Sequence, residues 1–144
     1  MKLYESESVK SKLFRLKQII KILEELSLSS KDEFVKKFEL NNLAMFNLLI
    51  GITVILDVGQ YLLSKSVGKT AENYKEVVRM LGEDSIIPKT FADDNIDMPK
   101  FRNLMVHDYD KVDEAMVYDY LQKAPDIFRQ FAKYFVEFMD KDEK

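Results

Sequence analysis

The residue types best suited to chemistry lie in one short segment, FRNLMVHDY, at positions 101–109. His107 is the only histidine of the chain, and imidazole is the one side chain whose unperturbed pKa lets it give and take a proton near neutrality. A lone histidine near a helix end is more often a structural residue. Arg102 and Asn103 shortly before it favour a catalytic site instead.

A helix through this segment would place Asn103 beside His107, because side chains four residues apart share one helix face. Arg102 would lie about 140° further round and would have to bend its long side chain to join them. Asn103 could orient the imidazole, and the guanidinium of Arg102 could hold a phosphate. This combination suits RNA cleavage without a metal, in which a base takes the proton of the 2′-hydroxyl and guanidinium stabilises the charge on the phosphoryl oxygens.

The departing 5′-oxygen also needs a proton, and one imidazole cannot easily act as base and acid in the same step. A two-fold dimer would bring a second His107 and a second Arg102 to the same groove. The chemistry therefore predicts a homodimer with a shared site. Because the net charge of −3 repels a polyanion, RNA must meet a local basic patch with cations such as Lys100 and Lys111.

The segment FRNLMVHDYDKVD resembles the signature of the HEPN superfamily, in which an Arg and a polar residue such as Asn precede a His by a few variable positions. More narrowly, Arg102-x-x-x-x-His107-x-Tyr109 resembles the HepT-like toxin branch, where a Tyr follows the His by two places. Similarity extends to ITVILDVGQYLLSK around Asp57, to NYKEVVRMLGEDSIIP and to VYDYL.

This resemblance implies a toxin: a metal-independent endoribonuclease without a cofactor, with Arg102 and His107 at the cleft of a helical homodimer. It also implies a partner, a minimal nucleotidyltransferase antitoxin that adds AMP groups to Tyr109. Bulk and negative charge beside His107 would then block or repel RNA. Two alternatives stay open: a catalytically silent HEPN module that binds a nucleotidyltransferase or a nucleotide, and a plain helical bundle with these residues in unrelated contacts.

Helices are the elements that must position the motif. Four glycines and three prolines are too few for the frequent chain reversals of a sandwich or barrel. With 47% hydrophobic and 33% charged residues, the chain is expected to fold as one domain over residues 1–144. The predicted fold is all-α, an up-and-down bundle of four to five helices like that of HEPN proteins.

Apolar residues that recur every three or four positions mark the predicted helices. Gly82 is expected to end the third helix by a left-handed cap, Pro88 to open a short helical turn, and Pro125 to kink or interrupt the last helix. The apolar run 43–56 is shorter than the roughly 18 residues of a membrane span, so it is interpreted as part of a buried central helix. The predicted helices cover about 9–27, 30–66, 70–82, 99–109 and 112–138.

Other candidate residues have simpler interpretations. Asp57 lies inside an apolar helix, where an unpaired carboxylate is costly, so it is expected either to pair with a basic residue or to lie near the cleft. We favour the role of a structural partner, for Arg102. Taken alone, Tyr109 would be a core tyrosine, and only the His-x-Tyr spacing sets it apart. The Phe-rich segment 128–138 has helical spacing, which favours packing over RNA stacking.

No metal site is expected. The aspartates between positions 93 and 113 lack the glycine and the terminal glutamate of a calcium loop, so we interpret them as residues of solvated turns. The absence of cysteine excludes disulfides and fits a reducing compartment. Segment 1–10 carries charges where a signal peptide needs an apolar core, so a cytoplasmic protein is expected.

Overall fold

The computed structural model describes residues 7–142, and all regular structure in that range is helical. The charged segment that argues against a signal peptide lies in part, residues 1–6, outside the described residues. Five α-helices have ten residues or more, which confirms an all-α bundle with four to five main helices. In chain order the elements are α1 (Glu7–Leu26), α2 (Lys31–Lys36), α3 (Phe38–Val67), α4 (Tyr74–Glu83), α5 (Lys89–Asp94), α6 (Met98–His107), the 3₁₀ turn η1 (Tyr109–Lys111) and α7 (Glu114–Asp142).

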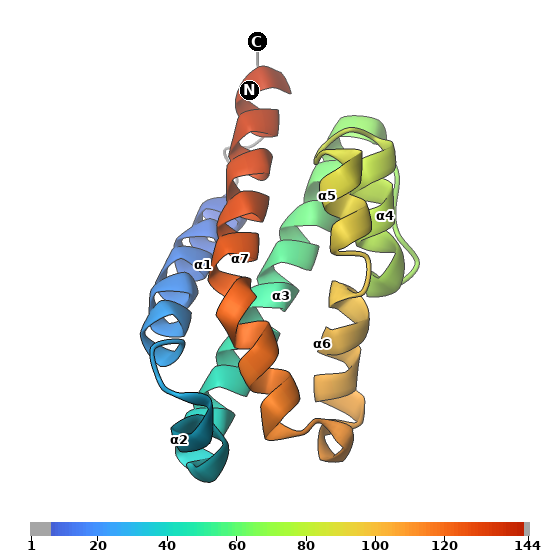
Figure 1. Ribbon diagram of the computed structural model, residues 1–144. Helices are drawn as coiled ribbons and strands as arrows, with labels where there is room; N and C mark the ends of the chain where they lie inside the picture. Colours follow the sequence, from blue (N-terminus) through green and yellow to red (C-terminus); the bar gives the residue numbers. More distant parts are fainter. Residues whose placement is uncertain (1–6, 143–144) are drawn as a thin grey trace.

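The centre of the bundle is α3, which contacts α1, α2, α4, α6 and α7. Figure 1 shows α1 and α7 side by side on one flank of α3, and α4, α5 and α6 on the other. Leu48, Ile52 and Ile55 in the middle of α3 are completely buried, and each contributes about 1.5–3 kcal/mol by leaving water. By length and composition α3 could cross a membrane, but here it is the core helix, as its apolar run predicts.

A close approach in the core joins α3 to α7. A Cβ atom at Gly51 would lie 2.5 Å from a ring carbon of Phe128, so only glycine leaves room for this ring. Phe128, Phe131 and Phe135 are all fully buried. The assignment of the Phe-rich segment to packing is confirmed.

The prediction of one continuous helix over residues 30–66 is wrong, because Lys37 is extended (φ −106°, ψ 103°) and separates α2 from α3. Ser30 caps α2, since its Oγ accepts a hydrogen bond from the backbone N–H of Glu33 at 3.2 Å. The break turns Phe34 into the core, where the centre of its ring lies 5.3 Å from the centre of the Tyr118 ring in α7. Burial of a large aromatic ring offsets the interrupted helical hydrogen bonding.

Two other predicted boundaries move. Gly82 does not end a helix: it is buried within α4, where a Cβ would lie 2.6 Å from the Cβ of Ala92 in α5. The left-handed backbone comes later, at Ser85 (φ 60°). The last helix begins at Glu114, because the Asp113 carboxylate accepts the N–H of Met116 at 2.8 Å and caps it, and α7 continues through Pro125 without interruption.

Candidate active site

The motif lies on α6, which is anchored between two other helices. α6 begins after Asp97 with Pro99 in its first turn, where the missing N–H of proline has no intrahelical acceptor to lose. It ends at His107, and the N–H of Asp108 bonds the carbonyl of Leu104 at 2.9 Å. Because α6 contacts both α3 and α4 and buries Met105, the motif side chains are held on a fixed support.

His107 and Asn103 line one open groove of about 600 Å³, as their four-residue spacing predicts. Lys75 from α4 and Lys100 from α6 line the same groove. The side chain of His107 is exposed, so a substrate can reach the imidazole from solvent. The two lysines bring positive charge to the groove of an acidic chain. Asp97 and Asp108, which also line the groove, offset part of this positive charge.

Arg102 does not line this groove, and its partners lie on two neighbouring helices and on α6 itself. Its Nε donates a hydrogen bond to Oγ1 of Thr53 in α3 at 3.1 Å, and its Nη1 donates to Oδ1 of Asn103 at 3.0 Å. Its guanidinium carbon lies 4.6 Å from the centre of the Tyr74 ring in α4. Within one protomer Arg102 therefore joins Asn103 of the motif, while α3 offers its Nε an acceptor and α4 offers its guanidinium an aromatic ring.

Asp57 has Tyr74 as its partner. The Tyr74 hydroxyl donates a hydrogen bond to Oδ1 of Asp57, so the expected link between Asp57 and Arg102 runs through the tyrosine. Burial, then the hydrogen bond and the negative charge of Asp57, raise the pKa of Tyr74 to about 12, against the opposing charge of Arg102. At neutral pH the hydroxyl therefore keeps its proton and can donate it to the carboxylate.

Sequence reasoning missed Thr53 and Tyr74. The Thr53 hydroxyl donates to the carbonyl of Leu49 at 2.8 Å, which leaves the oxygen lone pairs for Arg102. A usable signal existed for Thr53, since a hydroxyl interrupts an apolar run one turn before Asp57. Tyr74 carried no such signal, because a tyrosine on the apolar face of a short helix is ordinary core composition.

Tyr109 is not a core tyrosine. It belongs to η1, directly after α6, and its side chain is 68% exposed. The turn is held by the N–H of Lys111, which bonds the carbonyl of Asp108 at 2.8 Å. The hydroxyl is thus open to a modifying enzyme two residues after His107.

The aspartates near the motif act as caps or surface ion pairs. Asp93 lies 3.8 Å from Lys89, and Asp108 lies 3.7 Å from Lys111. Within residues 7–142 no group of three or more His, Cys, Asp or Glu side chains is arranged to hold a metal ion. Asp93 and Asp94 belong to α5, so the interpretation of the aspartates as residues of solvated turns does not hold for these two.

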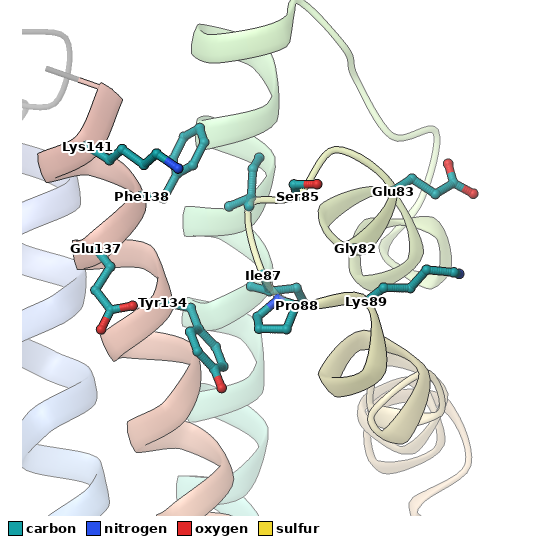
Figure 2. Close-up of a pocket in the computed structure, with 11 residues that line it drawn as sticks. Gly82, Glu83, Ser85, Ile87, Pro88, Lys89, Tyr134, Glu137, Phe138 and Lys141 are labelled. Carbon is teal, nitrogen blue, oxygen red and sulfur yellow. The ribbon is translucent and has the colours of Figure 1, made fainter. Parts of the chain in front are cut away.

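A second groove, of about 630 Å³, lies between α7 and the loop after α4. Figure 2 shows Tyr134 on the α7 side and Pro88 on the loop side. Its charges balance, with Glu83 and Glu137 against two lysines, and it contains no motif residue. The groove beside His107 is therefore the better candidate for a reaction site.

Solved structures with the same fold are toxin–antitoxin proteins. The Shewanella oneidensis HEPN toxin, tri-AMPylated and in complex with an MNT antitoxin, matches with a TM-score of 0.81 and 19% identity over 92% of this chain and 98% of its own. A toxin–antitoxin with AMP-PNP matches with a TM-score of 0.79 and 18% identity over 90% of this chain and 98% of that one. A mutant of the MntA–HpeT toxin–antitoxin matches with a TM-score of 0.80 and 18% identity, covering 91% and 99%.

At these identities the likeness shows the fold, which is that of HEPN toxins. No curated protein matches this chain. The family model described as "Ribonuclease HepT-like" matches residues 16–135, a span that contains α3, α6 and the whole Arg102 to Tyr109 motif. The resemblance drawn from the motif is confirmed, and this chain belongs to the ribonuclease HepT-like family.

Proposed function

We propose that this protein is a cytoplasmic toxin of one domain, an endoribonuclease that cuts RNA without a metal at a site shared by two protomers. Arg102 and His107 are its catalytic residues, and a nucleotidyltransferase antitoxin neutralises it by adding AMP to Tyr109. The observation that carries the proposal is the exposed imidazole of His107 in a lysine-bearing groove, on the same helix as the held guanidinium of Arg102. Membership of a ribonuclease family supports it.

In the proposed reaction, neutral His107 of one protomer takes the proton of a 2′-hydroxyl. The 2′-oxygen attacks the adjacent phosphorus, and the bond from phosphorus to the 5′-oxygen breaks. Protonated His107 of the partner protomer gives its proton to this oxygen, so the products are a 2′,3′-cyclic phosphate and a 5′-hydroxyl. Arg102 stabilises the charge that grows on the phosphoryl oxygens.

Exposed apolar side chains near Arg102 support the homodimer. Phe46 is 54% exposed and lies seven residues before Thr53 on the same face of α3, about 10 Å away along the helix. Leu43 on α3 and Val106 on α6 are also exposed, and these two helices are in contact. A second copy of the chain that covered this apolar face would bring two copies of the motif helix together.

The position of Tyr109 supports the proposed regulation. Its exposed hydroxyl follows the catalytic helix by two residues, so an added AMP would bring a bulky anion beside the groove of His107. The anion would compete with RNA phosphate for Lys75 and Lys100. One related solved structure contains an AMPylated HEPN toxin in complex with an MNT antitoxin, which supports the same pairing here.

A second candidate is a silent HEPN module that binds its nucleotidyltransferase or a nucleotide and cuts nothing. One observation favours it: in a single protomer Arg102 is held against Tyr74 rather than in the groove of His107. Both candidates keep the fold and the partner, so an activity assay must separate them.

The test is incubation of the purified protein with RNA in excess chelator, followed by analysis of the product ends. We expect cleavage that leaves cyclic phosphates. His107→Ala should lower the rate about 10²–10⁴-fold, the usual contribution of general acid–base catalysis, with unchanged thermal unfolding because the side chain is exposed. Intact RNA with the wild-type protein would exclude the nuclease and leave the silent module. Undiminished cleavage by His107→Ala would exclude His107 as the catalytic base and acid.

A further inference from the structure

Two side chains outside the motif contact the guanidinium of Arg102, and a third binds one of these two. Thr53 accepts the hydrogen bond from Nε, and the ring of Tyr74 lies against the guanidinium face. Asp57 accepts the hydrogen bond from the Tyr74 hydroxyl. Two of these residues belong to the core helix α3 and the third to α4, so the guanidinium is held by elements that do not contain the motif.

Each contact fixes a different degree of freedom. The hydrogen bond to Thr53 has a fixed direction. The Thr53 hydroxyl donates its proton to the carbonyl of Leu49, so toward Nε it can act only as an acceptor. The Tyr74 ring holds the guanidinium carbon 4.6 Å from its centre by attraction between the cation and the π electrons. The bond from Tyr74 to Asp57 stops the ring from turning away.

This arrangement decides which donors of Arg102 remain for a substrate. Nε is committed to Thr53 and one hydrogen of Nη1 to Asn103. Among the described residues Nη2 has no hydrogen-bond partner, and it remains with the second hydrogen of Nη1. These two nitrogens form the end of the guanidinium fork, which binds two phosphate oxygens at once.

We propose that Tyr74 is a positioning residue for Arg102, which acts with Asp57 and Thr53 to aim the Nη1 and Nη2 end of the guanidinium at the scissile phosphate. The inference rests on the proposed ribonuclease function. Tyr74 does not touch the substrate. Its effect passes through Arg102, so we expect it to influence kcat rather than the binding of RNA.

The test compares Tyr74→Leu, which removes ring and hydroxyl, with Tyr74→Phe, which keeps the ring. Asp57→Asn keeps an acceptor for the hydroxyl but removes the charge, and Thr53→Val removes the acceptor for Nε with little change of shape. Tyr134→Phe is the matched control, because it removes the hydroxyl of a half-buried tyrosine in the groove of Figure 2.

For cleavage by the full-length protein, Tyr74→Leu should lower kcat about 10- to 100-fold, the size expected when a catalytic group shifts by roughly 1 Å. KM should stay within about threefold. Tyr74→Phe should retain more activity than Tyr74→Leu, and Tyr134→Phe should match the wild type. An equal loss in the Tyr134→Phe control, or a change in KM alone, would contradict a positioning role.

A second readout does not depend on activity. In protein labelled with ¹⁵N-arginine, the Nε–H signal of Arg102 should exchange slowly with water, and Tyr74→Leu and Thr53→Val should speed this exchange about fivefold or more. Arg79, which bonds Glu76 and Glu83 on the surface, provides an internal reference. Unchanged exchange at Arg102 in both variants would overturn the inference.

The two readouts separate the two claims. If the wild-type protein cuts no RNA, the proposed function fails, and the exchange rate still decides whether Tyr74 holds Arg102. If RNA is cut but neither kcat nor exchange responds to Tyr74→Leu, the positioning role fails and the ribonuclease stands. Should Tyr74→Leu not fold, Tyr74→Phe and Thr53→Val carry both measurements.

Discussion

The side chain of Asn103 accepts a hydrogen bond from Nη1 of Arg102 at 3.0 Å and also lines the groove that contains His107. It is therefore the one motif residue that contacts Arg102 and shares a surface with the imidazole. Arg102 reaches toward α3 and His107 toward the open groove, and the side-chain amide of Asn103 lies between these two parts of the site.

Asn103→Ala should lower kcat of RNA cleavage about tenfold, because Arg102 loses one of its two hydrogen bonds and each lost bond to a charged group is worth about 1.5–3 kcal/mol before relaxation. Steady-state kinetics on a short RNA would measure it. Asn103→Asp is the informative companion: it restores an acceptor for Arg102 but places a negative charge where phosphate must bind. An Asp variant as active as the wild type would contradict the proposed phosphate site.

Phe46→Asp should convert a dimer to a monomer and abolish cleavage together, because it places a charge on the exposed apolar face of α3. Light scattering after size exclusion would give the mass. The matched control is Phe14→Asp on α1, whose ring is 63% exposed but lies away from α6. A monomeric wild type, or an active Phe46→Asp monomer, would exclude the shared site.

Tyr109→Phe should leave the fold and the cleavage rate within about twofold of the wild type, since an exposed hydroxyl contributes little to stability. It should, however, become insensitive to a nucleotidyltransferase antitoxin and ATP. Intact mass spectrometry would follow the addition of AMP to the wild type and its absence in the variant. AMP added to Tyr109→Phe with loss of activity would place the regulatory site elsewhere.

Gly51→Ala should destabilise the protein by about 1–3 kcal/mol, the usual cost of overpacking, because the new Cβ would collide with the ring of Phe128. Thermal unfolding should shift down by several degrees for a chain of this size. The double variant with Phe128→Leu should recover part of the loss, since the smaller side chain leaves room. Strictly additive effects of the two substitutions would show that the contact is not the cause.

Stability should fall in alkaline solution, because burial raises the pKa of Tyr120 as well as that of Tyr74, the latter to about 12. Below pH 10 both hydroxyls are protonated in the folded and the unfolded chain, so the full stability is present. Between pH 10 and 12 the unfolded chain loses these protons first, and the equilibrium moves toward unfolding.

Denaturant titrations at pH 8 to 11 would measure this dependence. Tyr120→Phe is the sharpest variant, since among the described residues the buried Tyr120 hydroxyl has no hydrogen-bond partner. The variant should be at least as stable as the wild type at pH 8 and lose less stability at pH 11. A large loss at pH 8 would mean that the hydroxyl is satisfied after all.

Much of the fold follows from the sequence, because the apolar residues of long helices recur with the helical period and so can be recognised from their spacing. The break at Lys37 could not be found this way: apolar residues continue on both sides of it, and only the burial of Phe34 against Tyr118 favours the turn. Gly82 was equally ambiguous, since a glycine at a helix end and a glycine that admits a neighbouring helix look alike without Ala92 in view.

In the candidate site, too, some features follow from local residue spacing and others depend on how the helices pack. The shared groove of Asn103 and His107 follows from their spacing on one helix. The partners of Arg102 do not, because Thr53 and Tyr74 reach it through the packing of α6 against α3 and α4. A local pattern cannot encode a contact that depends on how three helices assemble.

The same helix, α3, fills the centre of the bundle with one side and offers Thr53 and Asp57 to the site with the other. A small rotation of this helix would misalign the guanidinium while the protein still looks folded to circular dichroism. On heating, the protein should thus lose activity some degrees below its unfolding temperature. Substitutions deep in the interior should make the activity temperature-sensitive even though they leave the motif residues unchanged.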